Sequence, residues 1–564
     1  MKKTLLVLVG IIMISAMVFA GGNQNQTSAS TGPLNISIFH ETGGYPQPNK
    51  NNPVYDYIER NLGVTFTWDI LVGDIDQRRA TMIAGGRYPD ILELRGNQWI
   101  DAGALMDLEP LINQYGPRIK AHYKDVWERM RSADGKIYYL VNYHVYQGTD
   151  WNPNYDGPAF WIQKDILAQA NYPKIKTLDQ YFALIREYYA KNPTINGQPT
   201  IPFAILMHDW RAFELWNPPN FLAGNPNDGN GIVSMPGYNY RAFFTLDISK
   251  RWFQYLNARY AEGLVDRTFA TDTYDQYTAK ISSGRVLGQS VQGWQFAYQA
   301  DLANRDRGQN NRTQVPLAIV FDDSVKPWYR AQQVPNWLRG MGISVSAGRD
   351  KAIRIIQFIN ELLAPEHQRV INWGIEGVHW QWDADGSVTG TRGTPYRTAD
   401  QRTNWQNDNW QTLNRARLLG DIFPKIQGSF PDGWPSDLGH LLSERSATML
   451  PEDIALYNAY GVNGTNALMD PNPPANNIWF PTWSMEFATP QEGSPAQLAL
   501  ARLEETMKTR LPAIIMAQPA QFETLWAQYV QAMDAAGLAT YNAHMQQELD
   551  RTLRLLGVRD LPRR

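Results

Sequence analysis

The sequence has no cysteine among its 564 residues. Without cysteine the chain forms no disulfide, has no thiol nucleophile and offers no thiolate to a metal ion. It also lacks a cysteine that could carry a lipid after removal of an export signal. A disulfide-framed fold, a cysteine enzyme and a cysteine-linked lipid anchor are therefore excluded.

Long apolar segments are lacking too, apart from the run at residues 5–19. Lys2 and Lys3 precede this run, and Val18-Phe19-Ala20 places small residues where signal peptidases cut. The run is shorter than the roughly 20 residues of a membrane-spanning helix. We therefore predict a signal peptide at 1–20, a polar leader at 21–32 and a soluble, periplasmic mature protein, although a freely secreted protein would look the same.

Net charge is also small. The formal charge is −3, and loss of Lys2 and Lys3 with the signal would make it −5. So little charge on so long a chain indicates neither a nucleic-acid partner nor an anionic membrane surface. The length exceeds what one hydrophobic core serves and predicts two large lobes.

Aromatic residues are abundant, with 20 Trp and 28 Tyr, many beside Asn, Gln, Pro or Gly. Most should pack in cores and loops. A minority lining a cleft would stack on sugar rings, while amides and carboxylates would bind hydroxyl groups. The composition therefore favours a neutral, hydroxyl-rich ligand.

Hydrophobic periodicity predicts an α/β fold with a largely parallel sheet. Strands are expected at 34–38, 64–70 and 88–92, with helices at 53–61 and 74–84 between them. Thr177 and Gln180 form a capping-box pattern before a helix that should end at Asn192-Pro193. Further helices are expected at 350–363 and on both sides of Gly537 within 521–556, whereas the loop-rich segment 380–480 predicts no definite fold.

Several segments, taken in chain order, resemble a known family. They are 75–92, 159–185, GRVLGQSVQGWQ (284–295), VPLAIVF (315–321), GISVSA (342–347) and INWGIEGVHW (371–380). In this order they are similar to the extracellular solute-binding proteins of ABC sugar importers. The large LplA-like members, related to maltose- and alginate-oligosaccharide-binding proteins, resemble the chain most, over most of residues 34–380.

The resemblance implies a two-lobed, type II-like periplasmic-binding-protein fold that closes on its ligand by hinge motion. The first lobe would take residues 33–147 and 316–372, and the second 148–315 and 373–564, including extra C-terminal helices. It further implies a non-catalytic monomer that binds an oligosaccharide and meets the permease subunits of an importer in the membrane.

One segment departs from that family. Some large members carry a calcium-binding loop after the Thr-capped helix, but the stretch at 192–201, NPTINGQPTI, has no carboxylate. Calcium requires several hard oxygen ligands, usually including charged ones. The segment DADG at 383–386 lacks a later acidic ligand and is predicted to be a plain turn. No metal or other cofactor is expected.

Trp294 is the first candidate for ligand contact. It follows Gly293 at a strand end, where the matching family segment supplies a stacking aromatic; the alternative is a Trp in the core of a lobe. Glu376, His379 and Trp380 form a second group beside Gly374 and Gly377, whose lack of a side chain would let a ligand approach. The alternative there is a hydrogen bond that stabilises the hinge.

Further candidates come from loops and from tryptophans in polar contexts. Glu41 and Tyr45 follow the first strand, where open α/β sheets place their ligands, although a mobile surface loop is the alternative. Asp90 either faces the cleft or caps its turn locally. One or two of a last set are expected at the cleft: Trp99, Trp151, Trp210 and Trp337.

Two other functions remain open. A secreted glycosidase also needs a Trp-lined groove, together with two carboxylates held across the scissile bond. The 55 acidic residues always allow such pairs, so their presence decides nothing. A sugar-binding adhesin or scaffold is the second alternative, and it would need no hinge between lobes.

Overall fold

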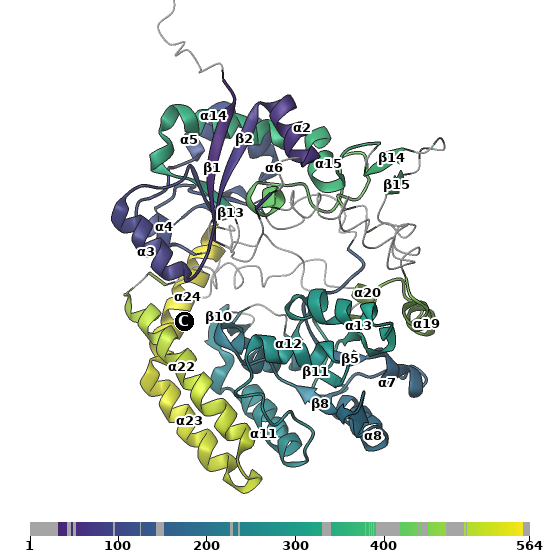
Figure 1. Ribbon diagram of the computed structural model, residues 1–564. Helices are drawn as coiled ribbons and strands as arrows, with labels where there is room; N and C mark the ends of the chain where they lie inside the picture. Colours follow the sequence, from purple (N-terminus) through teal and green to yellow (C-terminus); the bar gives the residue numbers. More distant parts are fainter. Residues whose placement is uncertain are drawn as a thin grey trace, which may run out of the picture.

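The computed structural model describes most of the chain from Gly32 to Leu555. The described residues are 32–41, 47–48, 52–93, 96–124, 126–132, 134–142, 152–225, 229–234, 237–329, 340–377, 379–382, 384, 386, 388–390, 418–437, 440, 449–469, 490–491 and 493–555. The predicted signal peptide and polar leader lie almost wholly outside these residues. The described helices and strands form two α/β bodies, one above the other in Figure 1.

The upper body, the first lobe, is built on a five-stranded sheet in the order β2-β1-β3-β13-β4. Its strands are β1 (Leu34–His40), β2 (Val64–Ile70), β3 (Ile91–Glu93), β4 (Leu140–Val141) and β13 (Gly340–Ile343). Strands β1, β2 and β3 are parallel, and β13 is antiparallel to both of its neighbours. Ile36 and Ile38 of β1 enter one hydrophobic core and Phe39 enters another, so helices cover both faces.

Local signals place the helices of the first lobe. Asn52 caps α2 (Pro53–Leu62), and Asp74 caps α3 (Ile75–Gly85). One face of the sheet is covered by α2, α5 (Glu109–Tyr115), α6 (Pro117–His122) and α14 (Arg349–Leu362), and the other by α3 and α4 (Gln98–Asp101). The predicted strands and helices between 34 and 92 are therefore present with small shifts in their bounds.

The lower body, the second lobe, has a four-stranded sheet in the order β12-β5-β11-β8. Its strands are β5 (Pro158–Gln163), β8 (Ile201–Ala204), β11 (Val286–Gln292) and β12 (Gln314–Leu317). Strand β5 runs antiparallel to β11 and β12, whereas β8 and β11 are parallel. The surrounding helices include α7 (Lys164–Gln169), α8 (Leu178–Lys191), α11 (Asp247–Ala261), α12 (Tyr274–Ser282) and α13 (Leu302–Asp306).

The Thr177 and Gln180 capping box predicted from the sequence is formed. The Thr177 hydroxyl accepts from the backbone of Gln180, the Gln180 side chain accepts from the backbone of Thr177 in return, and Asn192 is the C-cap after the last residue of α8, Lys191. Smaller elements of this lobe are β6 (Thr194–Ile195), β7 (Gln198–Pro199), β9 (Gly231–Ser234), β10 (Asn239–Ala242), α9 (Phe213–Trp216), α10 (Pro218–Leu222), α19 (Pro451–Tyr460) and α20 (Thr465–Met469).

The lobe boundaries differ from the predicted ones. Leu317, Ile319 and Tyr329 pack into the core of the second lobe, so the chain leaves this lobe after 329 and not at 315. Leu419 and Phe423 pack into the core of the first lobe together with Ile371 of α15 (Pro365–Trp373), and Phe430 packs against Trp373 of the same helix. These described residues therefore belong to the first lobe, whereas the sequence analysis assigned everything after 372 to the second. Among the described residues, buried apolar side chains at 34–141, 341–371 and 419–423 therefore form the core of the first lobe, and those at 159–329 and 456–553 form the core of the second.

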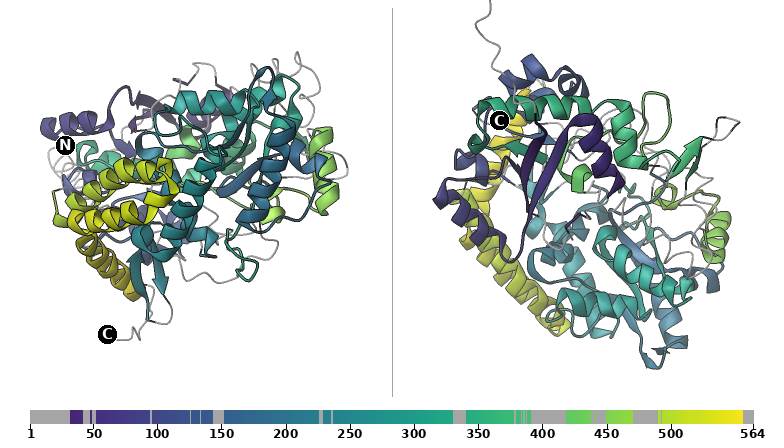
Figure 2. Two further views of the ribbon diagram at one scale, coloured as in Figure 1. Left: turned by 90° about the horizontal axis from the view of Figure 1, so that it is seen from below. Right: turned by 45° about the horizontal axis from the view of Figure 1, so that its top comes forward.

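Three C-terminal helices extend the second lobe. They are α22 (Pro495–Met516), α23 (Phe522–Ala536) and α24 (Leu538–Leu555), and the break at Gly537 lies where the sequence predicted it. Helix α24 contacts β10 of the second lobe and η1 (Trp127–Met130) of the first (Figure 1). Both views in Figure 2 show the C-terminal helices, in yellow, together along one side of the molecule. No helix in the described part of the chain has the length and apolarity of a membrane span.

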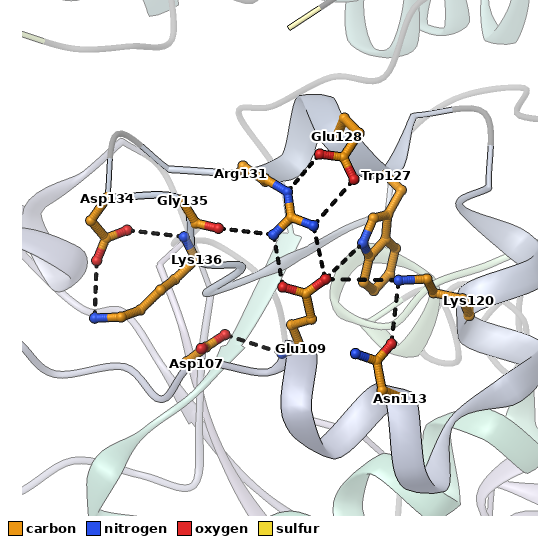
Figure 3. A network of polar contacts seen from close by, with 10 residues as sticks. All are labelled: Asp107, Glu109, Asn113, Lys120, Trp127, Glu128, Arg131, Asp134, Gly135 and Lys136. Atoms are coloured by element: carbon orange, nitrogen blue, oxygen red, sulfur yellow. Dashed lines mark hydrogen bonds and ion pairs between the residues drawn. The ribbon is translucent and has the colours of Figure 1, made fainter.

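A polar network fixes the segment that α24 contacts. Glu109 receives two hydrogen bonds from Arg131, at 2.7 and 2.8 Å, and one from the Trp127 ring nitrogen at 3.2 Å (Figure 3). The Lys120 ammonium lies 3.6 Å from the centre of the Trp127 ring. The hydrogen bonds from Arg131 hold the pKa of Glu109 well below its usual range, at about 2.

A cluster of charges around a buried ion pair joins α19 to the start of α7 in the second lobe. The Lys164 ammonium is paired with Asp453 and donates to the Thr313 hydroxyl at 2.7 Å, and Arg305 lies 3.4 Å from the same carboxylate. Asp301 is also part of this cluster, and its carboxylate accepts from the backbone of Gln314. Burial raises the pKa of Asp301 to about 6.

Asp301 predicts a pH dependence of stability. Because its folded pKa of about 6 exceeds its usual value of 3.8, the folded state binds the proton more tightly, and the stabilisation is lost as pH rises from about 4 to about 6. The two-unit difference corresponds to about 3 kcal/mol at most. In urea unfolding across this pH range, the free energy of unfolding of Asp301→Asn should therefore rise relative to that of the wild type as pH increases. Equal slopes in the two proteins would contradict this assignment.

Candidate functional site

Two aromatic segments follow adjacent parallel strands of the second lobe. Strand β8 ends at Ala204 and leads to η2 (Asp209–Ala212), whereas β11 ends at Gln292 and leads directly into η4 (Gly293–Gln295). Because β8 and β11 are parallel neighbours, both segments leave the same edge of the sheet. This carboxyl edge is where α/β sheets usually hold ligands.

These segments bring three aromatic rings together, and we name Trp210, Phe213 and Trp294 the aromatic platform. The centres of the Trp210 and Trp294 rings are 6.0 Å apart with 12° between their planes, and Phe213 lies 6.2 Å from Trp210 at 14°. Trp210 is 57% exposed and Trp294 is 41% exposed. Large, near-parallel aromatic faces open to solvent are unusual in a monomer and suit a flat, partly apolar ligand.

The turn that carries Trp294 is held against the start of β5. Gly293 donates to the carbonyl of Gly157 at 3.0 Å, and Trp294 donates to that of Asp156 at 3.2 Å. A Cβ atom at Gly293 would lie 2.6 Å from the Trp161 ring and 2.8 Å from the Asp156 backbone. Glycine therefore allows the turn to pack this closely, which leaves the following indole ring outside the core.

A buried carboxyl lies beneath the platform. Glu214, in α9, accepts a hydrogen bond from the backbone of Gln292 at 3.1 Å and is 3% exposed. Burial raises the pKa of Glu214 well above its usual value, against opposing hydrogen bonds from Gln292 and Gln295. This group therefore fastens the end of β11 to α9 and does not face solvent.

In the first lobe the candidate Glu41 serves an internal role. Its carboxylate is paired with Arg79 and accepts from the Trp99 ring nitrogen at 2.7 Å. Glu41 and Trp99 are 3% and 1% exposed, so both are packed inside this lobe. Burial raises the pKa of Glu41, against the opposing effect of Arg79. Neither side chain presents an exposed surface to a ligand in this structure.

The candidate Asp90 cross-links the sheet of the first lobe. Its carboxylate accepts from the backbone and hydroxyl of Ser37, both at 2.7 Å, and from Lys351 at 2.7 Å. These contacts join β3 to the middle of β1 and to the start of α14. The expected local cap is thus replaced by contacts between elements far apart in the sequence.

In the segment GIEGVHW (374–380), the candidate His379 contacts other residues of the same segment. His379 is buried and accepts from the backbone of Ile375 at 2.8 Å, and its ring fills the space where a Cβ atom of Gly374 would lie. Trp380 is buried against Trp373, whereas Glu376 is exposed. Burial lowers the pKa of His379. The glycine at 374 therefore accommodates this histidine, not a ligand.

Of the remaining candidates, Trp210 belongs to the platform, and three lie outside the described residues: Tyr45, Trp151 and Trp337. Sequence analysis missed Phe213 as a platform member. The run DWRAF at 209–213 packs aromatic and charged residues into a short segment, which is the signal that could have found it.

The stretch expected to lack calcium forms a small hairpin. Strands β6 and β7 pair antiparallel around Asn196 and Gly197, which both have positive φ, at 53° and 74°. No group of three or more His, Asp or Glu able to hold a metal ion occurs in the described part of the chain.

The melting temperature is therefore expected to stay the same when calcium is added or when a chelator is present, because this hairpin offers no charged oxygen ligand. Differential scanning fluorimetry at millimolar calcium and with EDTA tests this directly. An upward shift with calcium that the chelator reverses would contradict it.

Comparison with known proteins identifies solved structures that have a similar fold. No protein-family model and no curated protein sequence matches the chain. Solved structures do: an extracellular solute-binding protein from Bifidobacterium longum subsp. infantis has a TM-score of 0.64 at 17% identity over 93% of this chain and 99% of its own. The alginate-binding protein AlgQ2, solved without calcium ion, gives 0.61 at 17% identity over 94% and 100%.

A third similar structure is the ABC-transporter substrate-binding protein FusA of Streptococcus pneumoniae, as an EF-hand mutant in complex with fructo-nystose. Its TM-score is 0.60 at 17% identity over 92% of this chain and 99% of that one. Likeness over nearly the whole of both chains shows the fold: this chain has the two-lobed α/β fold of periplasmic binding proteins.

Proposed function

We propose that the protein is the substrate-binding component of an ABC importer and that it captures an oligosaccharide between its two lobes. The single observation that carries the proposal is the aromatic platform at the carboxyl edge of the second sheet. Sugars combine apolar C–H faces with hydroxyl groups, so a solvent-exposed indole pair suits their rings.

The fold also supports the proposal that the protein binds an oligosaccharide. Proteins of similar structure include one that binds alginate and one in complex with a fructo-nystose. Binding between hinged lobes removes a ligand from water and gives a permease a closed form to recognise. The ligand would leave unchanged, so the protein would be a receptor and not an enzyme.

The partners and the location belong to this proposal. Permease subunits in the membrane would contact both lobes of a monomeric receptor. The features of residues 1–20 support export with cleavage after Ala20, and the absence of cysteine supports a periplasmic protein without a lipid anchor.

A thermal-shift screen of the mature protein against plant and microbial oligosaccharides tests the function. A binding sugar should raise the melting temperature, by an amount that grows with concentration. Chromatography of each hit after long incubation should return it intact. A cleaved product would instead support a glycosidase, and binding without compaction in small-angle scattering would support an adhesin or scaffold.

A further inference from the structure

One arginine connects the three segments that surround the platform. The carbon at the centre of the Arg211 guanidinium lies 4.6 Å from the centre of the Trp210 ring and 4.0 Å from that of Tyr274, at the start of α12. Its Nε donates to the Gln295 side chain of η4 at 3.3 Å. Tyr274 in turn donates its hydroxyl proton to the Gln295 carbonyl. The segments after β8 and β11 and the start of α12 thus meet at Arg211.

The backbone beside Arg211 is strained. Asp209 has φ of +48°, a left-handed conformation that non-glycine residues adopt at a cost of about 1 kcal/mol or more. The Asp209 carboxylate pairs with the Arg211 guanidinium and accepts from the Arg211 backbone at 2.9 Å. These two contacts offset the strain and turn the chain so that Trp210 lies beside Trp294.

Other contacts hold the two indoles only in part: Phe213 stacks beside Trp210, and backbone hydrogen bonds fix the turn of Trp294 but not its ring. Both rings are exposed by about half, and each belongs to a short 3-10 turn that follows a strand. A turn of this length has few hydrogen bonds of its own. An exposed indole on such a turn would sample several rotamers unless a neighbouring group restricts it.

We propose that Arg211 is the positioning residue of the aromatic platform: clamped between Trp210 and Tyr274 and bonded to Asp209 and Gln295, it holds the two indoles near-parallel before a ligand arrives. The planar guanidinium is required, because it stacks on two rings while its edge donates hydrogen bonds. Preorganisation of this kind lowers the ordering cost of binding. Its role in sugar affinity depends on the proposed function, but the arrangement of the rings does not.

Circular dichroism tests the arrangement without any ligand. Two indoles 6.0 Å apart couple their electronic transitions and give a paired positive and negative signal in the far ultraviolet. The difference between wild type and Trp294→Phe measures this signal over the background of the other tryptophans. Arg211→Ala should lose more than half of it, and Arg211→Lys should recover little, because lysine has no planar group to stack.

Arg251→Ala is the matched control. Arg251 also lies over an aromatic ring, Phe321, at 4.4 Å and also pairs with an aspartate, Asp322, but it has no contact with the platform. This variant should keep the full signal. A wild-type signal in Arg211→Ala would overturn the proposal, and so would full recovery in Arg211→Lys.

Titration with an oligosaccharide hit from the screen measures the consequence. Arg211→Ala should weaken binding by about tenfold or more, and Arg251→Ala should not change it. Loss of the dichroism signal with unchanged affinity would overturn the role in binding. If no sugar binds the wild type, the proposed function fails while the dichroism result still decides how the rings are held.

Discussion

Replacing Trp294 with alanine is expected to weaken oligosaccharide binding by roughly 30-fold, about 2 kcal/mol, while the fold stays intact. The indole is 41% exposed and belongs to a surface turn, so its removal leaves no large internal cavity. What is lost is a flat apolar face beside Trp210, the feature on which the proposed function depends. Calorimetric titration with a hit from the screen, with thermal unfolding in parallel, gives both quantities.

Trp382→Ala provides the control for that experiment. Trp382, in β14 (Trp380–Trp382) of the first lobe, is 39% exposed, nearly the same as Trp294, but it packs against Trp434 and belongs to a separate cluster. Its loss should leave the affinity unchanged. Unchanged affinity in Trp294→Ala would remove this residue from the binding site, and equal losses in both variants would indicate a general effect on the fold.

The buried charge pair of the second lobe should have the largest effect on stability. Asp453→Ala would leave the Lys164 ammonium, whose side chain is 7% exposed, without its main counter-charge. Such a loss costs about 3 to 5 kcal/mol, and here it also removes the carboxylate that accepts from the backbone of Leu450 at the start of α19. Urea unfolding followed by tryptophan fluorescence measures the change.

Two comparison variants separate a buried charge from a general packing defect. Lys164→Met combined with Asp453→Leu should be clearly more stable than Asp453→Ala alone, because no unpaired charge remains at position 164. Glu187→Ala breaks the exposed pair with Lys191, so it should leave stability unchanged within error. A double variant no more stable than Asp453→Ala would contradict this account.

Because of the pair formed by Lys164 and Asp453, we expect the stability of the protein to fall in acid. Burial acts to raise the pKa of Asp453, but the charges of Lys164 and Arg305 outweigh it, so the pKa lies below its usual value. Stability from this carboxylate is therefore present at neutral pH and is lost as pH falls through its low folded pKa. Asp301 acts in the opposite direction, since its stabilisation is lost as pH rises towards 6.

Sequence reasoning succeeded where the deciding interactions are local. The Thr177 and Gln180 capping box, the break at Gly537 and the alternation of β1 each depend on neighbours a few residues apart, and all are present. The lobe boundaries were predicted less well. Residues 316–329 and 418–423 join cores made by distant segments, and no local pattern reports which core an apolar residue enters.

The candidate site divides in the same way. The sequence marked Trp294 from its place after Gly293 in the family-like segment, and Trp210 from its polar surroundings. Their pairing arises only because β8 and β11 lie side by side and parallel in the folded sheet. Likewise Glu41 follows a parallel strand, as a ligand-binding residue would. Its carboxylate, however, is already paired with Arg79 and hydrogen-bonded to the Trp99 ring nitrogen. Which hydrogen-bonding groups remain available to a ligand depends on partners brought together from far along the chain.

By itself, the sequence determined the fold class, because the periodicity of its helices and strands predicted an α/β fold and the described sheets have it. Only the tertiary structure decided which aromatic rings meet, which carboxylates are already paired and where one lobe ends. The physical reason is the separation along the sequence of the residues that interact. Caps, turns and alternation act over a few residues, whereas stacking and ion pairing at the site join segments separated by tens of residues, so they exist only once the sheets have assembled.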